Sequence, residues 1–131
     1  MQQWRVNLIR LALVISLLAL MTSQVLALTD VSLPIHPRAI PSSIVHQSRK
    51  GEGTKFFSVA FKARAPYEEV VRYYRQQAGR NVQITVNVSA KLLNTLILLH
   101  RKPEDQININ ISSKVGGKVT EVEITRNLFE P

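Results

Sequence analysis

Apolar residues recur at every second position in several segments of this chain, which is the period of a strand with one buried face. The alternation is clear in segments 54–63, 82–88 and 107–111. Segment 92–100 is more continuously apolar, which is typical of a central strand or of one covered on both faces. These four segments predict the main strands of a β-sheet.

The spacing of apolar residues changes to a helical period of 3.6 only between residues 66 and 78. Pro66 suits the first position of a helix, and Gly79 is placed to end it. The apolar residues of this segment fall on one stripe and are Tyr67, Val70, Val71, Tyr74 and Ala78. We therefore predict a single amphipathic helix that packs on the sheet.

The two glycines at 116–117 predict a two-residue hairpin turn between the last two strands. Such a turn sets Ile111 opposite Val122 and Ile109 opposite Ile124, so apolar residues face apolar residues. Shifting the register by one residue would pair these apolar side chains with glutamates and spoil both faces. The hydrophobic pattern therefore predicts this register.

A short strand is also compatible with residues 43–47, and the glycines at 49–53 predict a turn after it. The resulting order is β-β-α-β-β-β-β, with long runs of consecutive strands. This order predicts an α+β fold, a two-layer sandwich in which an antiparallel sheet of about five to six strands carries one helix on one face. Residues 43–131 would form this single domain.

Residues 1–27 have the organisation of a secretory signal peptide. Arg5 and Arg10 precede an apolar core at 11–21, and small side chains lead to a predicted cleavage site after Ala27. A helix over that core rises only about 16 Å, against about 30 Å of hydrocarbon, which makes an uncleaved membrane anchor the weaker alternative. We predict a periplasmic or secreted product with no membrane span after cleavage.

Three prolines in residues 28–42 predict an extended, irregular lead-in rather than a helix. The whole chain has a net charge of +8, and losing the two arginines of the leader leaves +6. A chain of this length can bury a core without a metal or disulfide to support it.

Candidate catalytic chemistry is sparse. The absence of cysteine excludes disulfides, thiolate metal sites and cysteine nucleophiles. His36, His46 and His100 show no metal-ligand spacing, and no phosphate-binding glycine motif is present. We therefore predict no metal, no cofactor and no enzymatic activity. A small exported hydrolase that uses His36 or His100 beside a carboxylate is an alternative.

Basic residues are the feature with the greatest functional weight. We expect a binding surface whose candidate residues are Lys62, Arg64, Arg72, Tyr73 and Arg75. A weaker candidate is the outward row of polar residues at 108, 110 and 112. Positive charge attracts anionic surfaces such as lipid headgroups or envelope polymers. The charges are interspersed rather than in runs, which favours the alternative that these are scattered surface residues of a soluble protein. Nucleic acid is an unlikely partner.

Residues 34–39 read Pro-x-x-Pro-x-Ala, and the predicted helix contains the pair Tyr73-Tyr74. In both features the chain resembles a family of small exported bacterial domains of largely unknown function. That family often has an aromatic residue and a glycine around the second proline, where this chain has His36 and Arg38. The resemblance implies a sheet completed by further strands, and it implies no catalytic residues.

These observations together predict an exported, non-enzymatic binding or accessory module of bacterial type. It would contact a partner protein or an anionic envelope polymer, through the sheet face opposite the helix or through its basic rim. Besides the hydrolase, the alternative is a membrane-tethered structural subunit that retains its leader.

Overall fold

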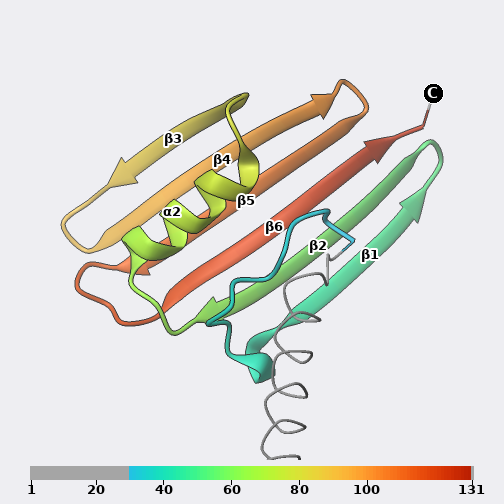
Figure 1. The fold of residues 1–131 in the computed structure, drawn as a ribbon. Helices are drawn as coiled ribbons and strands as arrows, with labels where there is room; N and C mark the ends of the chain where they lie inside the picture. Colours follow the sequence, from blue (N-terminus) through green and yellow to red (C-terminus); the bar gives the residue numbers. More distant parts are fainter. Residues whose placement is uncertain (1–29, 131) are drawn as a thin grey trace, which may run out of the picture.

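The computed structural model describes residues 30–130, which form one antiparallel sheet of six strands, one α-helix and one 3₁₀ helix. The predicted α+β architecture, with the helix on one face of the sheet, is confirmed (Figure 1). The elements are η1 (Pro41–Ser43), β1 (Val45–Gly51), β2 (Thr54–Ala63), α2 (Tyr67–Ala78), β3 (Val82–Val88), β4 (Leu92–Lys102), β5 (Asp105–Lys114) and β6 (Thr120–Phe129).

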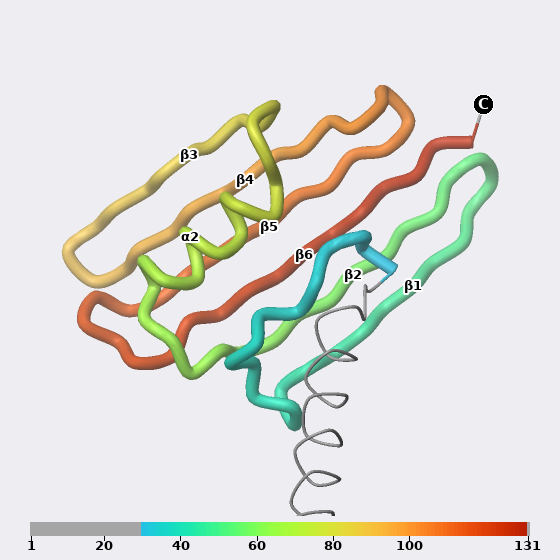
Figure 2. The backbone as a smooth tube through the Cα atoms, in the orientation of Figure 1, coloured from blue at the N-terminus to red at the C-terminus, as the bar shows by residue number. Residues whose placement is uncertain are grey.

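The strands lie in the order β1-β2-β6-β5-β4-β3, so β1 and β3 form the two edges of the sheet. Strands β2 and β6 pair along ten residues, from Thr54 opposite Phe129 to Ala63 opposite Thr120. After β2, the chain crosses one face of the sheet as α2, which packs over β4 and β5, and then enters the far edge as β3 (Figure 2).

The core lies between the sheet and α2. Val70 and Tyr74 are the fully buried residues of the helix, and the other residues of the predicted stripe are half-buried against them, which confirms the stripe. The remaining core residues of the four central strands are Val59, Phe61, Ala63, Ile97, Leu99, Ile107, Ile109, Ile111, Val122 and Ile124. Each strand contributes alternate residues, as its period of two predicts.

The lead-in lies on the same face as α2 and runs over β2 and β6 (Figure 1). Val31 and Leu33 are 1% and 2% exposed, so this segment contributes to the core. It is irregular as predicted, but it ends in the short helix η1, which the sequence analysis did not anticipate. Pro41 occupies the start of η1, a position where its fixed φ is favourable.

Two predicted turns are placed differently. The turn expected at 49–53 is shorter, because β1 continues to Gly51, which pairs with Thr54. The register of β5 and β6 is confirmed, with Ile111 opposite Val122, but the two-residue turn at 116–117 is wrong. Residues 115–119 lie outside both strands, because the end of β5 follows β4 instead of β6: the N–H of Val115 donates to the carbonyl of Lys91 at 3.0 Å.

The predicted leader and the cleavage site after Ala27 lie outside the described residues. Within residues 30–130, no helix is both long enough and apolar enough to cross a membrane.

Candidate functional site

The helix covers only part of the sheet. With 12 residues, α2 is about 18 Å long, whereas the 10 and 11 residues of β5 and β4 span about 33 Å or more. It packs over β4 and β5 and leaves the second half of the edge strand β3 open, whereas Val82 and Ile84 in its first half are half-buried against the core. Val86 and Val88 face the helix side of the sheet and are 58% and 68% exposed.

A groove of about 520 Å³ therefore runs between α2 and β3. We call it the helix–β3 groove, and its lining residues are Tyr67, Glu68, Val71, Arg72, Arg75, Gln76, Val86 and Thr95. Its floor is formed by Val86 and Thr95 from the sheet, with Val71 on the helical wall. The hydroxyl groups of Tyr67 and Thr95 are hydrogen-bonded to each other, which fixes the start of the helix on β4.

Two arginines form the rim of this groove. Arg72 and Arg75 lie three positions apart, so they project from the same side of α2. Both are exposed, and neither has an ion-pair partner among the described residues. The one acidic residue of the lining is Glu68, which leaves the groove with a net positive charge. An apolar floor below unpaired guanidinium groups suits a molecule that is partly apolar and carries an anion.

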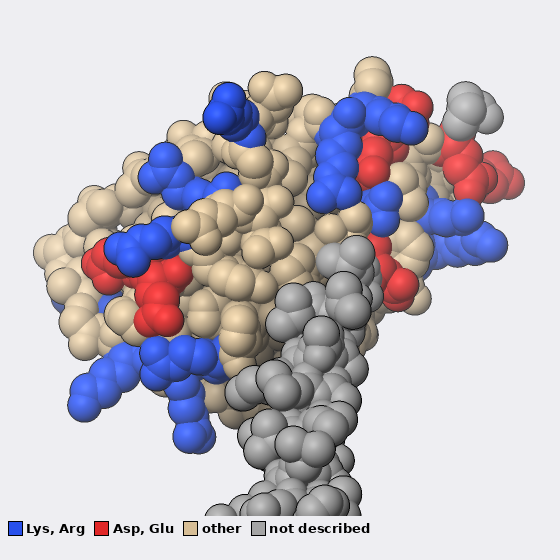
Figure 3. All heavy atoms as spheres, viewed as in Figure 1, with Lys and Arg blue, Asp and Glu red and all other residues tan. Residues whose placement is uncertain are grey.

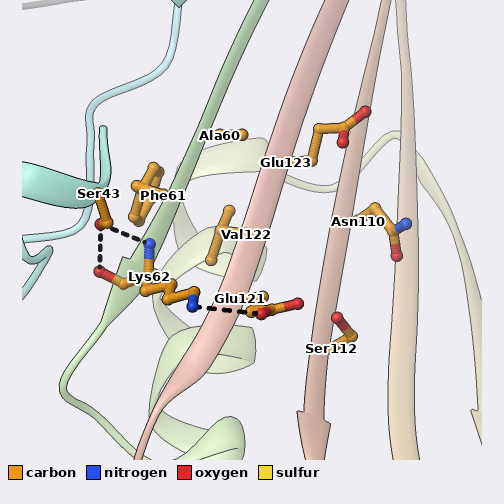
Figure 4. A pocket seen from close by; sticks show the side chains of 9 residues that line it. All are labelled: Ser43, Ala60, Phe61, Lys62, Asn110, Ser112, Glu121, Val122 and Glu123. Carbon is orange, nitrogen blue, oxygen red and sulfur yellow. Dashed lines mark hydrogen bonds and ion pairs between the residues drawn. The ribbon is translucent and has the colours of Figure 1, made fainter. Parts of the chain in front are cut away.

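The other candidate residues lie elsewhere. Lys62 is on the opposite face of the sheet, where it lines a second hollow, of about 340 Å³. Figure 4 shows Lys62 of β2 reaching toward Glu121 of β6, at 4.0 Å between Nζ and Oε1. Glu123 also lines this hollow, so acidic residues outnumber basic ones there.

Arg64 and Tyr73 are also separate from the groove. The N–H of Arg64 donates to the carbonyl of Arg38 at 2.9 Å, which ties the end of β2 to the lead-in. Tyr73 is half-buried, and its ring packs edge-on against His36, with 4.8 Å between ring centroids. Of the five candidate residues, the structure therefore brings only Arg72 and Arg75 together in one hollow.

Basic residues do not form one continuous patch on the helix side of the molecule. Figure 3 shows Lys and Arg side chains in separate groups around this face, with Asp and Glu between them. Part of this charge is neutralised locally, for example where Arg38 bonds Glu69 at 3.3 Å and Lys55 bonds Glu130 at 3.0 Å. Local placement of the arginines, and not total charge, therefore distinguishes the helix–β3 groove.

The outward polar row lies on the open face of β5. Asn108 and Ser112 are half-buried and Asn110 is exposed. The side chain of Asn94 on β4 donates to the side-chain oxygen of Asn110 at 2.6 Å. These neutral side chains hydrogen-bond across the strands, and they offer no charge to an anionic partner.

The three histidines are dispersed. His36 is buried, and its Nδ1 accepts a hydrogen bond from the N–H of Arg38 at 3.0 Å. His46 on β1 and His100 on β4 are exposed and four strand spacings apart, about 19 Å. Residues 30–130 contain no group of three or more histidine or acidic side chains able to hold a metal ion.

Burial lowers the pKa of His36, and nearby Arg38 lowers it further, while Glu69 opposes the shift. Glu69 is the acidic residue that raises the pKa of this histidine, but its carboxylate is already paired with Arg38. The imidazole is therefore held neutral as a hydrogen-bond acceptor inside the fold.

No family model matches this chain, and neither a curated protein nor a solved structure matches it. The resemblance to small exported bacterial domains stays a prediction.

The apolar half of the groove was not predictable from local patterns. The alternation of Val86 and Val88 indicates the buried face of a strand, and the helical positions of the arginines indicate an outward surface. Comparing the length of the predicted helix with that of the strands would have shown that one helix cannot cover the whole face.

Proposed function

We propose that this chain is an exported, non-enzymatic binding module that holds an anionic, partly apolar component of the bacterial cell envelope. The helix–β3 groove would bind it, with the anionic group at the rim and the apolar part on the floor. The observation that carries this proposal is the position of Arg72 and Arg75, both without ion-pair partners in the described structure, above the exposed Val86.

The chemistry of the groove supports an anion of the phosphate or carboxylate type. Guanidinium groups bind such oxyanions through paired hydrogen bonds and keep their charge at any physiological pH. The complex gains free energy when an acyl chain or another apolar segment covers the exposed Val86 at the floor. Anionic lipids and lipopolysaccharide combine the two properties.

The geometry gives less support to a hydrolase. The Nδ1 atom of His36 is occupied by a hydrogen bond, and Glu69, the acid that acts electrostatically on this histidine, is bonded to Arg38. His100 is exposed near the end of β4, where the basic residues Arg101 and Lys102 follow it. The hydrolase hypothesis needs a carboxylate beside His36 or His100, and neither histidine is hydrogen-bonded or ion-paired to one in the described structure.

The open face of the sheet is a second candidate only for a partner without strong negative charge. Glu121 and Glu123 line its hollow, and Lys62 is directed toward Glu121 (Figure 4). An anionic polymer is repelled there, so we assign such a polymer to the groove.

Vesicle binding tests the proposal. The exported protein is mixed with vesicles of neutral phospholipid, with or without anionic phospholipid, and bound protein is measured by co-sedimentation. We expect binding that needs the anionic lipid and weakens steeply with added salt. Replacing Arg72 and Arg75 together with alanine removes about 2 kcal/mol of attraction, which weakens binding by about 30-fold.

The matched control is the double variant Lys114→Ala with Lys118→Ala, which removes the same charge from two exposed positions, the last residue of β5 and the segment between β5 and β6. We expect it to retain most of the binding. Equal losses in both double variants would show that only total charge matters, and salt-insensitive binding or no binding would also contradict the proposal.

A further inference from the structure

The strand β3 forms an open edge of the sheet within the described structure. Only β4 pairs with it, so alternate N–H and C=O groups along its other side have no strand partner. The helix packs over β4 and β5 and does not overhang this edge. The seven residues of β3, VQITVNV, include no charged residue and no proline.

The opposite edge is different. Strand β1 reads VHQSRKG, and its exposed residues include Arg49 and Lys50. Charged side chains on an edge strand repel a second copy of the same strand, which is a common protection against pairing. Strand β3 has no such protection, although it belongs to a basic chain in which such residues are plentiful.

We propose that β3 pairs antiparallel with β3 of a second copy of this chain, around a two-fold axis through Thr85. Ile84 then faces Val86 of the second copy, and Val82 faces Val88 of the second copy, all on the helix side. On the open side, Gln83 faces Asn87 of the second copy and can hydrogen-bond to it. Apolar residues meet apolar residues and polar residues meet polar ones, so the strand is complementary to itself.

The pairing covers the most exposed apolar side chains of the helix side. Val86 and Val88, 58% and 68% exposed in the single chain, gain neighbours across the new strand pair. It extends the sheet to twelve strands without charge repulsion along the contact. Because one strand pair is a small interface, the dimer is expected to be reversible and dependent on concentration.

The dimer also completes the helix–β3 groove. A two-fold axis perpendicular to the sheet leaves both α2 helices on the same face, with two copies of β3 between them. The two half-open grooves then become one trough with an apolar floor, and Arg72 and Arg75 line it from both sides. The pairing of the two β3 strands needs no ligand. Binding of an anionic ligand in the trough rests on the proposed function.

Sedimentation equilibrium of the exported protein without ligand tests the pairing. We expect the average mass to rise from one chain toward two as the concentration increases. Thr85→Lys places two positive charges opposite each other at the axis and raises the concentration for half-dimerisation by more than about tenfold. Thr85 is exposed and outside the core, and the thermal unfolding of the variant verifies its fold.

Two controls make the result specific. Gln47→Lys adds the same charge to an exposed position on the open side of the other edge strand, and we expect the dimer to persist. Mixing Thr85→Lys with Thr85→Glu should restore dimers, because opposite charges then meet at the axis. A chain that stays monomeric at every concentration, or a dimer that survives Thr85→Lys, overturns the proposal. Vesicle binding by a monomeric chain would overturn the pairing and leave the proposed function standing.

Discussion

The most sheltered ion pair of the described residues joins β5 to β6, and its arginine also bonds the start of the lead-in. Arg126 donates from Nε and Nη2 to the two carboxylate oxygens of Asp105, at 2.9 Å each, and from Nη1 to the carbonyl of Asp30 at 3.2 Å. The Asp105 and Arg126 side chains are only 13% and 22% exposed. The hydrogen bonds from Arg126 lower the pKa of Asp105, partly opposed by desolvation.

His36 is the second titratable residue that links the lead-in to the fold. Its ring packs on Tyr73, and its Nδ1 accepts the N–H of Arg38. Burial, the largest influence, lowers the pKa of His36 below the ordinary value of 6.5. The folded protein therefore holds this residue neutral, and protonation of Nδ1 would remove its hydrogen bond.

These two residues predict a loss of stability in two acidic steps. Both have a lower pKa in the folded chain than in the unfolded chain, so the unfolded chain binds more protons as the pH falls. The contribution of neutral His36 to the free energy of unfolding is present above about pH 6.5 and is lost below it, as the pH falls through the pKa of the folded state. The Asp105 contribution is lost in the same way below about pH 3.8. Urea unfolding from pH 8 to about pH 2 measures both steps.

Two variants separate the steps. His36→Asn keeps a hydrogen-bond acceptor but does not titrate, so the first step should disappear and the second remain. Asp105→Asn should remove the second step and keep the first. It should also lower the free energy of unfolding at neutral pH by about 2 kcal/mol, because it breaks a charged, paired hydrogen bond. An unchanged first step in His36→Asn would show that another group controls it.

At the scale of the elements, the lead-in is part of the fold and not a tail in front of it. The hydroxyl group of the buried Tyr74 donates to the carbonyl of Pro34 at 3.0 Å, which connects α2 with the lead-in. Arg101 also donates to the side-chain oxygen of Ser32, at 2.6 Å. The sheet, α2 and the lead-in therefore share one core.

Leu33→Ala tests this role of the lead-in. Leu33 is 2% exposed, so its truncation should leave a cavity and lower the free energy of unfolding by about 2–5 kcal/mol. Val45→Ala on the exposed strand β1 is the control, with an expected change within about 0.5 kcal/mol. Urea unfolding gives both values, and a negligible effect of Leu33→Ala would mean that the lead-in contributes little to the core.

Periodicity was sufficient to predict most elements from the sequence. Alternation indicated β2, β3 and the register of β5 with β6, and the helical stripe indicated α2, because each element needs one buried face. The lead-in has no period, so its packing through Val31 and Leu33 was not predictable in the same way. The turn at 116–117 was misplaced because contacts of Val115 with β4 decide where β5 ends.

At the scale of the whole molecule, the site depends on strand order, which local patterns do not specify. Arg72 and Arg75 were predictable as exposed residues from their place on the helix. Their neighbour Val86 was not, because β3 reaches this position only by crossing to the far edge of the sheet. Lys62 and Tyr73 are close to the arginines in the sequence, but the fold places Lys62 on the other face and Tyr73 against His36.

The same strand order accounts for both proposals. It leaves β3 uncovered by α2, which opens the groove, and unpaired on one side, which opens the edge. A single feature of the topology thus provides a surface for an anionic ligand and a surface for a second copy.

A titration followed by nuclear magnetic resonance tests the groove most directly. Backbone amide signals of the isotope-labelled protein are recorded while a short-chain phosphatidylglycerol is added. If the groove binds the anionic headgroup, the largest shifts fall on α2 around Arg72 and Arg75 and on β3 around Val86. Shifts confined to the open face of β5 and β6, around Asn110 and Glu121, would contradict the account.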